Sequence, residues 1–140
     1  MQLEKTISRY ESELRKCRDV FQKKTKDYGT SWRVLRPSSL TDQLFIKAQR
    51  IRTIEENKAQ KVEEGVESEF IGLVNYAIIG LIQLKMNDNT NLDLSEHEAL
   101  THFDAESKAI QELMLAKNHD YGEAWRDMRV SSFTDLILMK

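Results

Sequence analysis

A 24-residue stretch that the chain carries twice is the feature that most constrains its fold. KTKDYGTSWRVLRPSSLTDQLFIK spans residues 24–47, and KNHDYGEAWRDMRVSSFTDLILMK spans residues 117–140, 93 positions later. The two copies are identical at twelve of 24 positions, whereas the segments before them, 7–26 and 100–119, are identical at only two of twenty. Identity is therefore concentrated in one motif, K-x-x-D-Y-G-x-x-W-R-x-x-R-x-S-S-x-T-D-x-x-x-x-K. Any fold for this chain has to place that motif twice.

Helical periodicity flanks both copies of the motif. From Ile7 to Phe21, apolar side chains recur at spacings of three and four residues, which is typical of a helix with one buried face. This pattern predicts a helix over about residues 3–26. The same reasoning predicts four further helices, over about residues 39–56, 66–86, 96–118 and 132–140. Three Ser residues, each followed three positions later by an acid, have the spacing of capping boxes: Ser39–Asp42, Ser95–Glu98 and Ser132–Asp135.

Composition agrees with an all-helical interpretation. The 140 residues include only five Gly and one Pro, and 40% of them are hydrophobic. We therefore predict one all-α domain over residues 1–140, an antiparallel helical bundle built from an internal helix–loop–helix repeat. The first copy covers about residues 3–86, and an incomplete second copy covers about residues 96–140. Cys17 is the only cysteine, which excludes an intrachain disulfide and a multi-cysteine zinc site.

Charge and hydropathy narrow the classes of function. The formal net charge is −2, so a global electrostatic attraction to nucleic acid or to an anionic membrane is not indicated. The longest apolar run, FIGLVNYAIIGLIQL at 70–84, has fifteen residues and includes Asn75 and Gln83. A membrane span needs about 20 predominantly apolar residues, so we interpret this run as a core helix. We expect a cytoplasmic protein that binds neither membrane nor nucleic acid.

Two interpretations of the repeated motif stay open. In the first, the motif is architectural, because its Gly ends one helix, its Ser and Asp cap the next, and its Trp and Tyr pack the two together. In the second, it also binds an anionic ligand, since the Arg fork suits phosphate and an aromatic ring can stack on a base. The candidate ligand-binding residues are Asp27, Tyr28, Trp32, Arg33, Arg36, Lys47 and Arg50 in the first copy, and Asp120, Tyr121, Trp125, Arg126 and Arg129 in the second.

A second set of candidates lies at the start of the segment EEGVESEFIGLVNYAIIGLIQL (63–84). At 100° per residue, the side chains that fall on one side of a helix are Glu64, Glu67, Ser68 and Asn75. Carboxylates one turn apart can share Mg²⁺, which prefers oxygen ligands. Alternatively, these are ordinary first-turn acids that favour the positive end of the helix dipole.

Taken together, these features resemble the nucleotide-modification-associated domain family, first type. Its members are helical proteins of bacteria and phages that carry a K-x-x-DYG-x-x-W-R loop. The resemblance covers about residues 20–85 and again 113–140, and it rests on Asp27-Tyr28-Gly29, Trp32-Arg33, Lys47, Arg50-Ile51 and Asn75-Tyr76-Ala77. That family is distantly similar to the MazG-like all-α nucleoside triphosphate pyrophosphohydrolases, which form helical bundles and are usually oligomeric.

The resemblance implies a chemistry for the acidic residues. MazG-like enzymes hold Mg²⁺ with E-x-x-E and E-x-x-D motifs on neighbouring helices and release pyrophosphate from nucleotides. Glu64 and Glu67 match the first motif and would be the catalytic pair that holds the metal. Glu69 would open the second motif as a third metal ligand, but the last position of that motif is Gly72 here. Gly72 and Gly80 are poor helix residues, which we interpret as places of close helix–helix approach.

Two function hypotheses follow. The first is a Mg²⁺-dependent nucleotide-binding protein or nucleoside triphosphate pyrophosphohydrolase. In it, the acids hold the metal, Lys and Arg side chains neutralise the phosphates, and an aromatic ring stacks on the base. The second is a non-catalytic helical scaffold or interaction module whose Arg-rich loops recognise a partner. A cleft between the DYG loop and the surface that carries Glu64 and Glu67 would favour the first.

The second copy of the motif ends at Lys140, directly after the apolar residues LILM. Either this copy is cut short, which we favour, or it pairs with another chain. In both cases the apolar residues need cover, so we expect a homo-oligomer.

Overall fold

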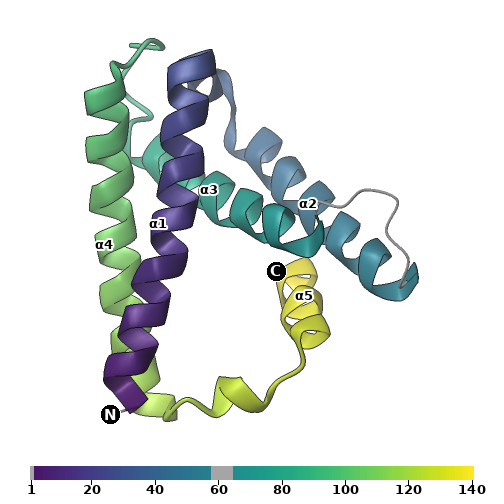
Figure 1. Ribbon diagram of the computed structural model, residues 1–140. Helices are drawn as coiled ribbons and strands as arrows, with labels where there is room; N and C mark the ends of the chain where they lie inside the picture. The colour runs from purple at the N-terminus through teal and green to yellow at the C-terminus, as the bar shows by residue number, and fades with distance from the viewer. Residues whose placement is uncertain (1, 58–64) are drawn as a thin grey trace.

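The computed structural model describes residues 2–57 and 65–140, and over these residues it is all-helical (Figure 1). Its helices are α1 (Gln2–Tyr28), α2 (Pro37–Asn57), α3 (Gly65–Lys85), α4 (Glu96–Tyr121) and α5 (Val130–Met139). Two short 3₁₀ turns, η1 (Ser31–Val34) and η2 (Ala124–Asp127), follow α1 and α4. The predicted all-α fold class is confirmed, and each copy of the motif folds as the end of one helix, a 3₁₀ turn and the start of the next.

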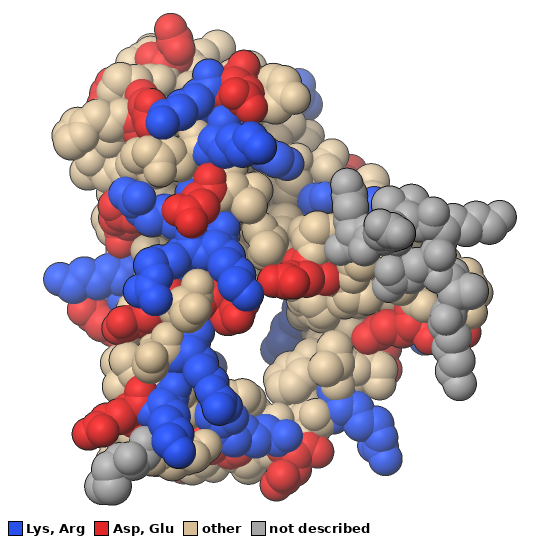
Figure 2. Space-filling model, viewed as in Figure 1, with Lys and Arg blue, Asp and Glu red and all other residues tan. Residues whose placement is uncertain are grey.

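Three helices, α1, α2 and α4, pack against α3. α1 and α4 lie side by side and run in opposite directions, and α3 crosses behind them (Figure 1). α2 packs along α3, and α5 packs on α2. The segment that contains η2 therefore bridges from the α1–α4 pair to α5, and Figure 2 shows an opening between the lower half of α1 and α5.

The core consists of two clusters joined by α3. In the larger one, Phe21 of α1 lies 4.7 Å from Phe103 of α4, centroid to centroid, over Ile78 and Ile82 of α3. In the smaller one, Ala48 and Ile51 of α2 meet Leu73 of α3, and α5 covers them with Leu138. These contacts fix the upper half of α1 and the middle of α3 relative to each other.

α3 is the one helix, within the described ranges, that has the length and apolar composition of a membrane span. Core helices often share these properties, and α3 contacts α1, α2 and α4. Ile78 and Ile82 on its buried face are each 1% exposed. The structure thus buries one face of the apolar run of 70–84 in the core of the bundle, whereas Val74, Leu81 and Leu84 of the same run are exposed.

The helix ends show which local signals decide the boundaries. Gly29 and Gly122 have φ of 67° and 64°, the left-handed conformation that ends a helix, so α1 and α4 stop after the Tyr of each DYG. The capping box of Ser95 and Glu98 is confirmed, with both hydrogen bonds at 3.1 Å.

The capping boxes predicted at Ser39 and Ser132 are wrong. α2 begins two residues early, at Pro37, because the fixed φ of proline suits the first helical position. α5 likewise begins at Val130, after the extended residue Arg129, which makes no side-chain cap. Ser39 and Ser132 therefore lie inside the first turn.

Candidate functional site

A pocket of about 570 Å³ opens between the C-terminal half of α1, η1, α2 and the middle of α3. Pockets of roughly 300–1,000 Å³ hold small ligands in proteins. The polar and aromatic side chains in its wall are Phe21, Lys24, Thr25, Tyr28, Ser31, Trp32, Lys47, Ser68, Asn75 and Tyr76. The structure thus brings three of the predicted binding residues, Tyr28, Trp32 and Lys47, to one pocket. The DYG loop faces α3 across it, although Glu67 does not line it.

Lys47 reaches the pocket from α2 by lying across Gly72 of α3. A Cβ at Gly72 would be 2.7 Å from both Cδ and Cε of Lys47, which is closer than atoms can approach. The Lys47 ammonium lies 3.5 Å from a Glu69 oxygen and 5.8 Å from the centroid of the Tyr76 ring. Gly72 therefore makes room for a lysine side chain. The prediction of a close helix–helix approach is wrong at Gly80, where a Cβ would have no heavy atom of another segment within 4 Å.

Glu69 is held by two cations. Only 5% of this residue is exposed, and its second oxygen accepts a hydrogen bond of 2.7 Å from Nη1 of Arg50. Both carboxylate oxygens thus have a cationic partner, Lys47 or Arg50. The structure places Arg50 in this ion pair, outside the pocket wall.

The described acids do not supply a donor set that fits Mg²⁺. Glu67 is exposed and lies 3.3 Å from the Lys16 ammonium, and Glu69 is already paired. Within residues 2–57 and 65–140, no three His, Cys, Asp or Glu side chains come together as metal ligands. Glu64, the other predicted ligand, lies outside the described residues.

Two buried polar atoms in the pocket residues have no protein partner. They are Nε1 of Trp32 and Oδ1 of Asn75. Asn75 is 8% exposed, and its Nδ2 donates a hydrogen bond of 3.0 Å to the backbone carbonyl of Cys17. Buried polar atoms are nearly always bonded, so these two are exceptions, and neither atom is accessible in this structure.

Arg33, a predicted binding residue, lies away from the pocket. Arg33 is 6% exposed. Its guanidinium donates hydrogen bonds to the Gln83 side chain and to the carbonyls of Asn89 and Asn91, the last two at 2.8 and 3.0 Å. Gln83 in turn donates to the carbonyls of Arg33 and Leu35, at 2.8 and 2.9 Å. Arg33 thus ties η1 to the end of α3 and to the loop that follows.

Two more predicted residues of the first copy lie outside the pocket wall. Asp27 is exposed near the end of α1. Arg36 is exposed just before α2, where its carbonyl accepts the Leu40 N–H at 3.0 Å. Tyr28 lines the pocket but is 74% exposed, so its ring lies at the mouth.

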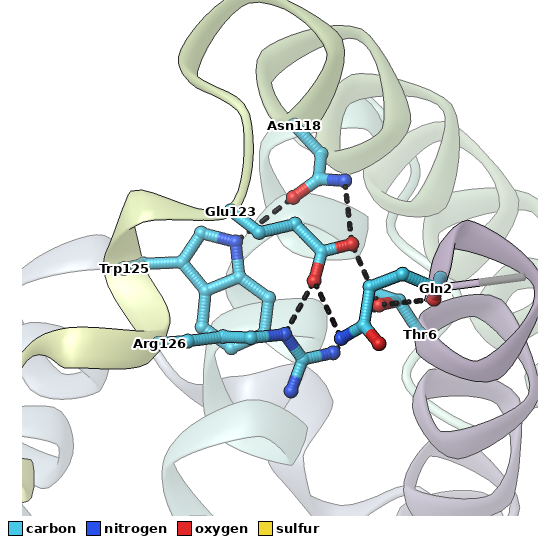
Figure 3. Close-up of polar contacts among 6 residues, drawn as sticks. All are labelled: Gln2, Thr6, Asn118, Glu123, Trp125 and Arg126. Carbon is cyan, nitrogen blue, oxygen red and sulfur yellow. Dashed lines mark hydrogen bonds and ion pairs between the residues drawn. The ribbon is translucent and has the colours of Figure 1, made fainter.

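The second copy of the motif is bonded into the fold. Glu123 accepts hydrogen bonds from the guanidinium of Arg126 and from the Thr6 hydroxyl of α1, the latter at 2.8 Å (Figure 3). Arg126 also donates to the Thr6 hydroxyl at 2.6 Å, and Gln2 donates to Glu123 at 3.3 Å. These contacts join η2 to the first turns of α1.

Trp125 is part of the same network. Its Nε1 donates to Oδ1 of Asn118 at 2.8 Å, and the Arg126 guanidinium lies 4.7 Å from its ring centroid (Figure 3). The other candidates of the second copy, Asp120, Tyr121 and Arg129, are exposed. Among the second-copy candidates, Trp125 and Arg126 thus belong to the network that holds η2 on α1.

A family model described as nucleotide modification associated domain 1 matches residues 24–84 and 117–140. The chain belongs to this family. The predicted family resemblance is confirmed, and the first matched segment contains every pocket residue except Val20 and Phe21. Comparison with curated proteins and with solved structures finds no match. The family description connects the chain with nucleotide modification and leaves the reaction and the ligand open.

Lys24 and Tyr76 line the pocket of this nucleotide modification associated domain but were not among the predicted ligand-binding residues. Lys24 is the first residue of the repeated motif. Tyr76 stands inside the Asn75-Tyr76-Ala77 pattern, and its place one turn after Gly72 was the available signal.

The contact between Gly72 and Lys47 predicts different outcomes for two Gly→Ala changes in one helix. At Gly80 the added Cβ meets open space, so we expect the helix-propensity gain of up to about 1 kcal/mol in the free energy of unfolding. At Gly72 the Cβ displaces Lys47 from Glu69 and Tyr76, so we expect a smaller gain or a loss. Urea denaturation measures both. Equal gains at the two positions would contradict the close contact.

The Glu123 network predicts a loss of stability in acid. The Arg126 guanidinium first, and then the Thr6 hydroxyl, lower the pKa of the Glu123 carboxyl from 4.5 to about 2. Because this pKa is lower in the folded than in the unfolded chain, the carboxylate stabilises the fold above about pH 4.5 and loses this effect toward pH 2. We expect the difference in unfolding free energy between wild type and Glu123→Gln to shrink over that range in urea titrations. A difference that is constant with pH would show that the carboxylate is not involved.

Proposed function

We propose that this chain binds a nucleotide in the pocket between α1, η1, α2 and α3, with the base inside and the phosphates beside the lysines. The composition of the pocket wall carries this proposal. Its described residues include two cations, Lys24 and Lys47, no carboxylate, and the aromatic rings of Tyr28, Trp32 and Tyr76. Such a wall suits a ligand that is anionic at one end and flat and aromatic at the other.

The surroundings of the pocket favour an anion more than the net charge of −2 suggests. α1 carries eight Lys and Arg against five Asp and Glu, and Figure 2 shows these basic side chains gathered along the helix. Arg50 keeps one oxygen of Glu69 paired at 2.7 Å. Lys47, at 3.5 Å from the other oxygen, can therefore turn to a phosphate without leaving a buried carboxylate alone.

The catalytic form of this proposal is a Mg²⁺-dependent nucleoside triphosphate pyrophosphohydrolase. It rests on the similarity to the MazG-like enzymes and on Glu64 and Glu67, because Glu69 is paired with cations. Since the described acids do not fit Mg²⁺, the geometry supports nucleotide binding better than it supports hydrolysis.

A non-catalytic scaffold is the second candidate function, and the second copy of the motif favours it. There the same Trp-Arg pair is bonded to Asn118, Glu123 and Thr6 of this chain. A motif that is structural in one copy can be structural in both. The two candidate functions are therefore distinguished by whether the pocket at the first copy binds a nucleotide.

Self-association is a further part of the proposal. α5 leaves Leu136, Ile137 and Met139 exposed, at 42%, 39% and 69%. Covering an exposed apolar helix face is favourable, and a second copy of the chain would cover this one. We expect light scattering to give a mass above 16.4 kDa and Ile137→Lys to reduce it. A monomer at every concentration would contradict this.

A lysine substitution tests nucleotide binding directly. Removing a charge-assisted contact to phosphate costs about 1.5–3 kcal/mol, so we expect Lys47→Ala to weaken nucleoside triphosphate binding by about 10- to 100-fold in calorimetry. Lys108→Ala is the matched control, because it removes the same charge from an exposed position on α4 that does not line the pocket. Equal effects of both changes, or no binding by the wild type, would contradict the proposal.

A release assay separates binding from hydrolysis. A panel of ribo- and deoxyribonucleoside triphosphates is incubated with Mg²⁺ and the chain, and pyrophosphate is measured. The binding function predicts calorimetric heats without release. Release that is lost in Glu64→Gln or Glu67→Gln would add catalysis and assign it to these acids.

A further inference from the structure

Lys47 lies between a buried carboxylate and the pocket. Its ammonium is 3.5 Å from Oε2 of Glu69, a residue that is only 5% exposed. Lys47 also lines the pocket, whereas Glu69 does not. A lysine ammonium is a compact positive charge on a flexible stem, with three donors that rotate together. Glu69 and an anion in the pocket therefore compete for the same positive charge.

The stem of Lys47 is packed against α3 at Gly72. A Cβ at Gly72 would be 2.7 Å from Cδ and Cε of Lys47 and 3.1 Å from its Nζ. This packing keeps the end of the side chain next to both the Glu69 carboxylate and the pocket. Rotation about the last bonds of the stem is thus enough to turn the ammonium from one to the other.

Arg50 is the second cation on Glu69, and it is the closer one. From the same helix as Lys47, its Nη1 donates to Oε1 of Glu69 at 2.7 Å. The Arg50 side chain is 48% exposed and does not line the pocket. Because a buried carboxylate without a partner is costly, Glu69 retains at least one cation. Arg50 supplies that cation from outside the pocket.

We propose that Arg50 is a positioning residue that acts on the ligand through Glu69 and Lys47. By holding the Glu69 carboxylate, Arg50 lets the Lys47 ammonium turn to the phosphate of a bound nucleotide. Without Arg50, the carboxylate holds Lys47, and the pocket loses one of its cations. This inference rests on the proposed nucleotide binding, and it adds how residues outside the pocket set the affinity for phosphate.

A double-mutant cycle on Arg50 and Glu69 tests this role. Calorimetry measures the affinity for ribo- and deoxyribonucleoside triphosphates in the presence of EDTA. We expect Arg50→Gln to weaken binding by about tenfold and Glu69→Gln, which removes the competitor, to strengthen it by about three- to tenfold. In protein that already carries Glu69→Gln, Arg50→Gln should change the affinity by less than about twofold. Arg50→Lys keeps a cation for Glu69 and should restore most of the wild-type affinity.

Arg52 supplies the matched control. Its side chain is also 48% exposed on α2, and it pairs with Glu56 at 3.2 Å and does not line the pocket. Arg52→Gln therefore removes the same charge without touching Glu69, and it should change the affinity by less than about twofold. A melting curve verifies that each variant is folded. The gain expected for Glu69→Gln is an effect that damage to the fold does not imitate.

The outcomes separate this inference from the proposed function. If Arg50→Gln weakens binding equally with and without Glu69→Gln, Arg50 acts by its charge alone and the positioning role is overturned. Weaker binding by Glu69→Gln would also overturn it, because Glu69 would then support the ligand instead of competing with it. In both cases nucleotide binding itself stands. If wild-type protein binds none of the triphosphates, the proposed function fails, and this inference fails with it.

Discussion

Buried hydrogen bonds between Arg33 and Gln83 hold the pocket wall in place. The guanidinium bonds to the Gln83 side chain and to two carbonyls of the α3–α4 loop, and the Gln83 amide returns bonds to three carbonyls around η1. A buried charge has to have partners on every side, so this arrangement has few alternatives. It fixes η1 against α3, and Trp32, one residue before Arg33, is thereby fixed beside the pocket.

Corresponding residues in the two copies of the motif make different contacts. In the first copy, Arg33 turns to residues 50 and more positions away and leaves the Trp32 donor unused. In the second, Arg126 pairs with Glu123 of its own loop and with Thr6, and Trp125 bonds to Asn118. The architectural and ligand-binding interpretations of the motif are therefore not exclusive. Trp125 and Arg126 of the second copy are bonded within the fold, whereas Trp32 of the first copy lines a pocket.

Much of the fold follows from local signals in the sequence. Apolar spacing identifies the five helices, and the DYG glycines end α1 and α4 because only glycine adopts positive φ readily. The failures are also local in origin. At Ser39, the capping signal competed with Pro37, whose ring starts α2 two residues earlier. That the helices form one bundle was thus predictable, whereas the residues at which they begin and end were less so.

The site was predictable only in part, because its residues are selected by long-range contacts. Arg33 and Arg36 belong to the same motif, yet the first is buried against Gln83, 50 residues away, and the second is exposed. No spacing rule distinguishes them. Asn75 was noticeable as an amide in an apolar run, but its hydrogen bond to the Cys17 carbonyl, 58 residues earlier, could not be read from the spacing.

Gly72 affects both the charge of the pocket wall and the fit of the nearby acids to Mg²⁺. The E-x-x-D pattern that begins at Glu69 would need a carboxylate at position 72, but the structure fills that space with the side chain of Lys47. Glycine there removes a negative charge from the wall and admits a positive one, while Glu69 is occupied by Lys47 and Arg50. Each change moves the local charge away from what Mg²⁺ needs and toward what a phosphate needs. The residue that departs from the metal motif is thus the residue that lets the Lys47 side chain reach the pocket.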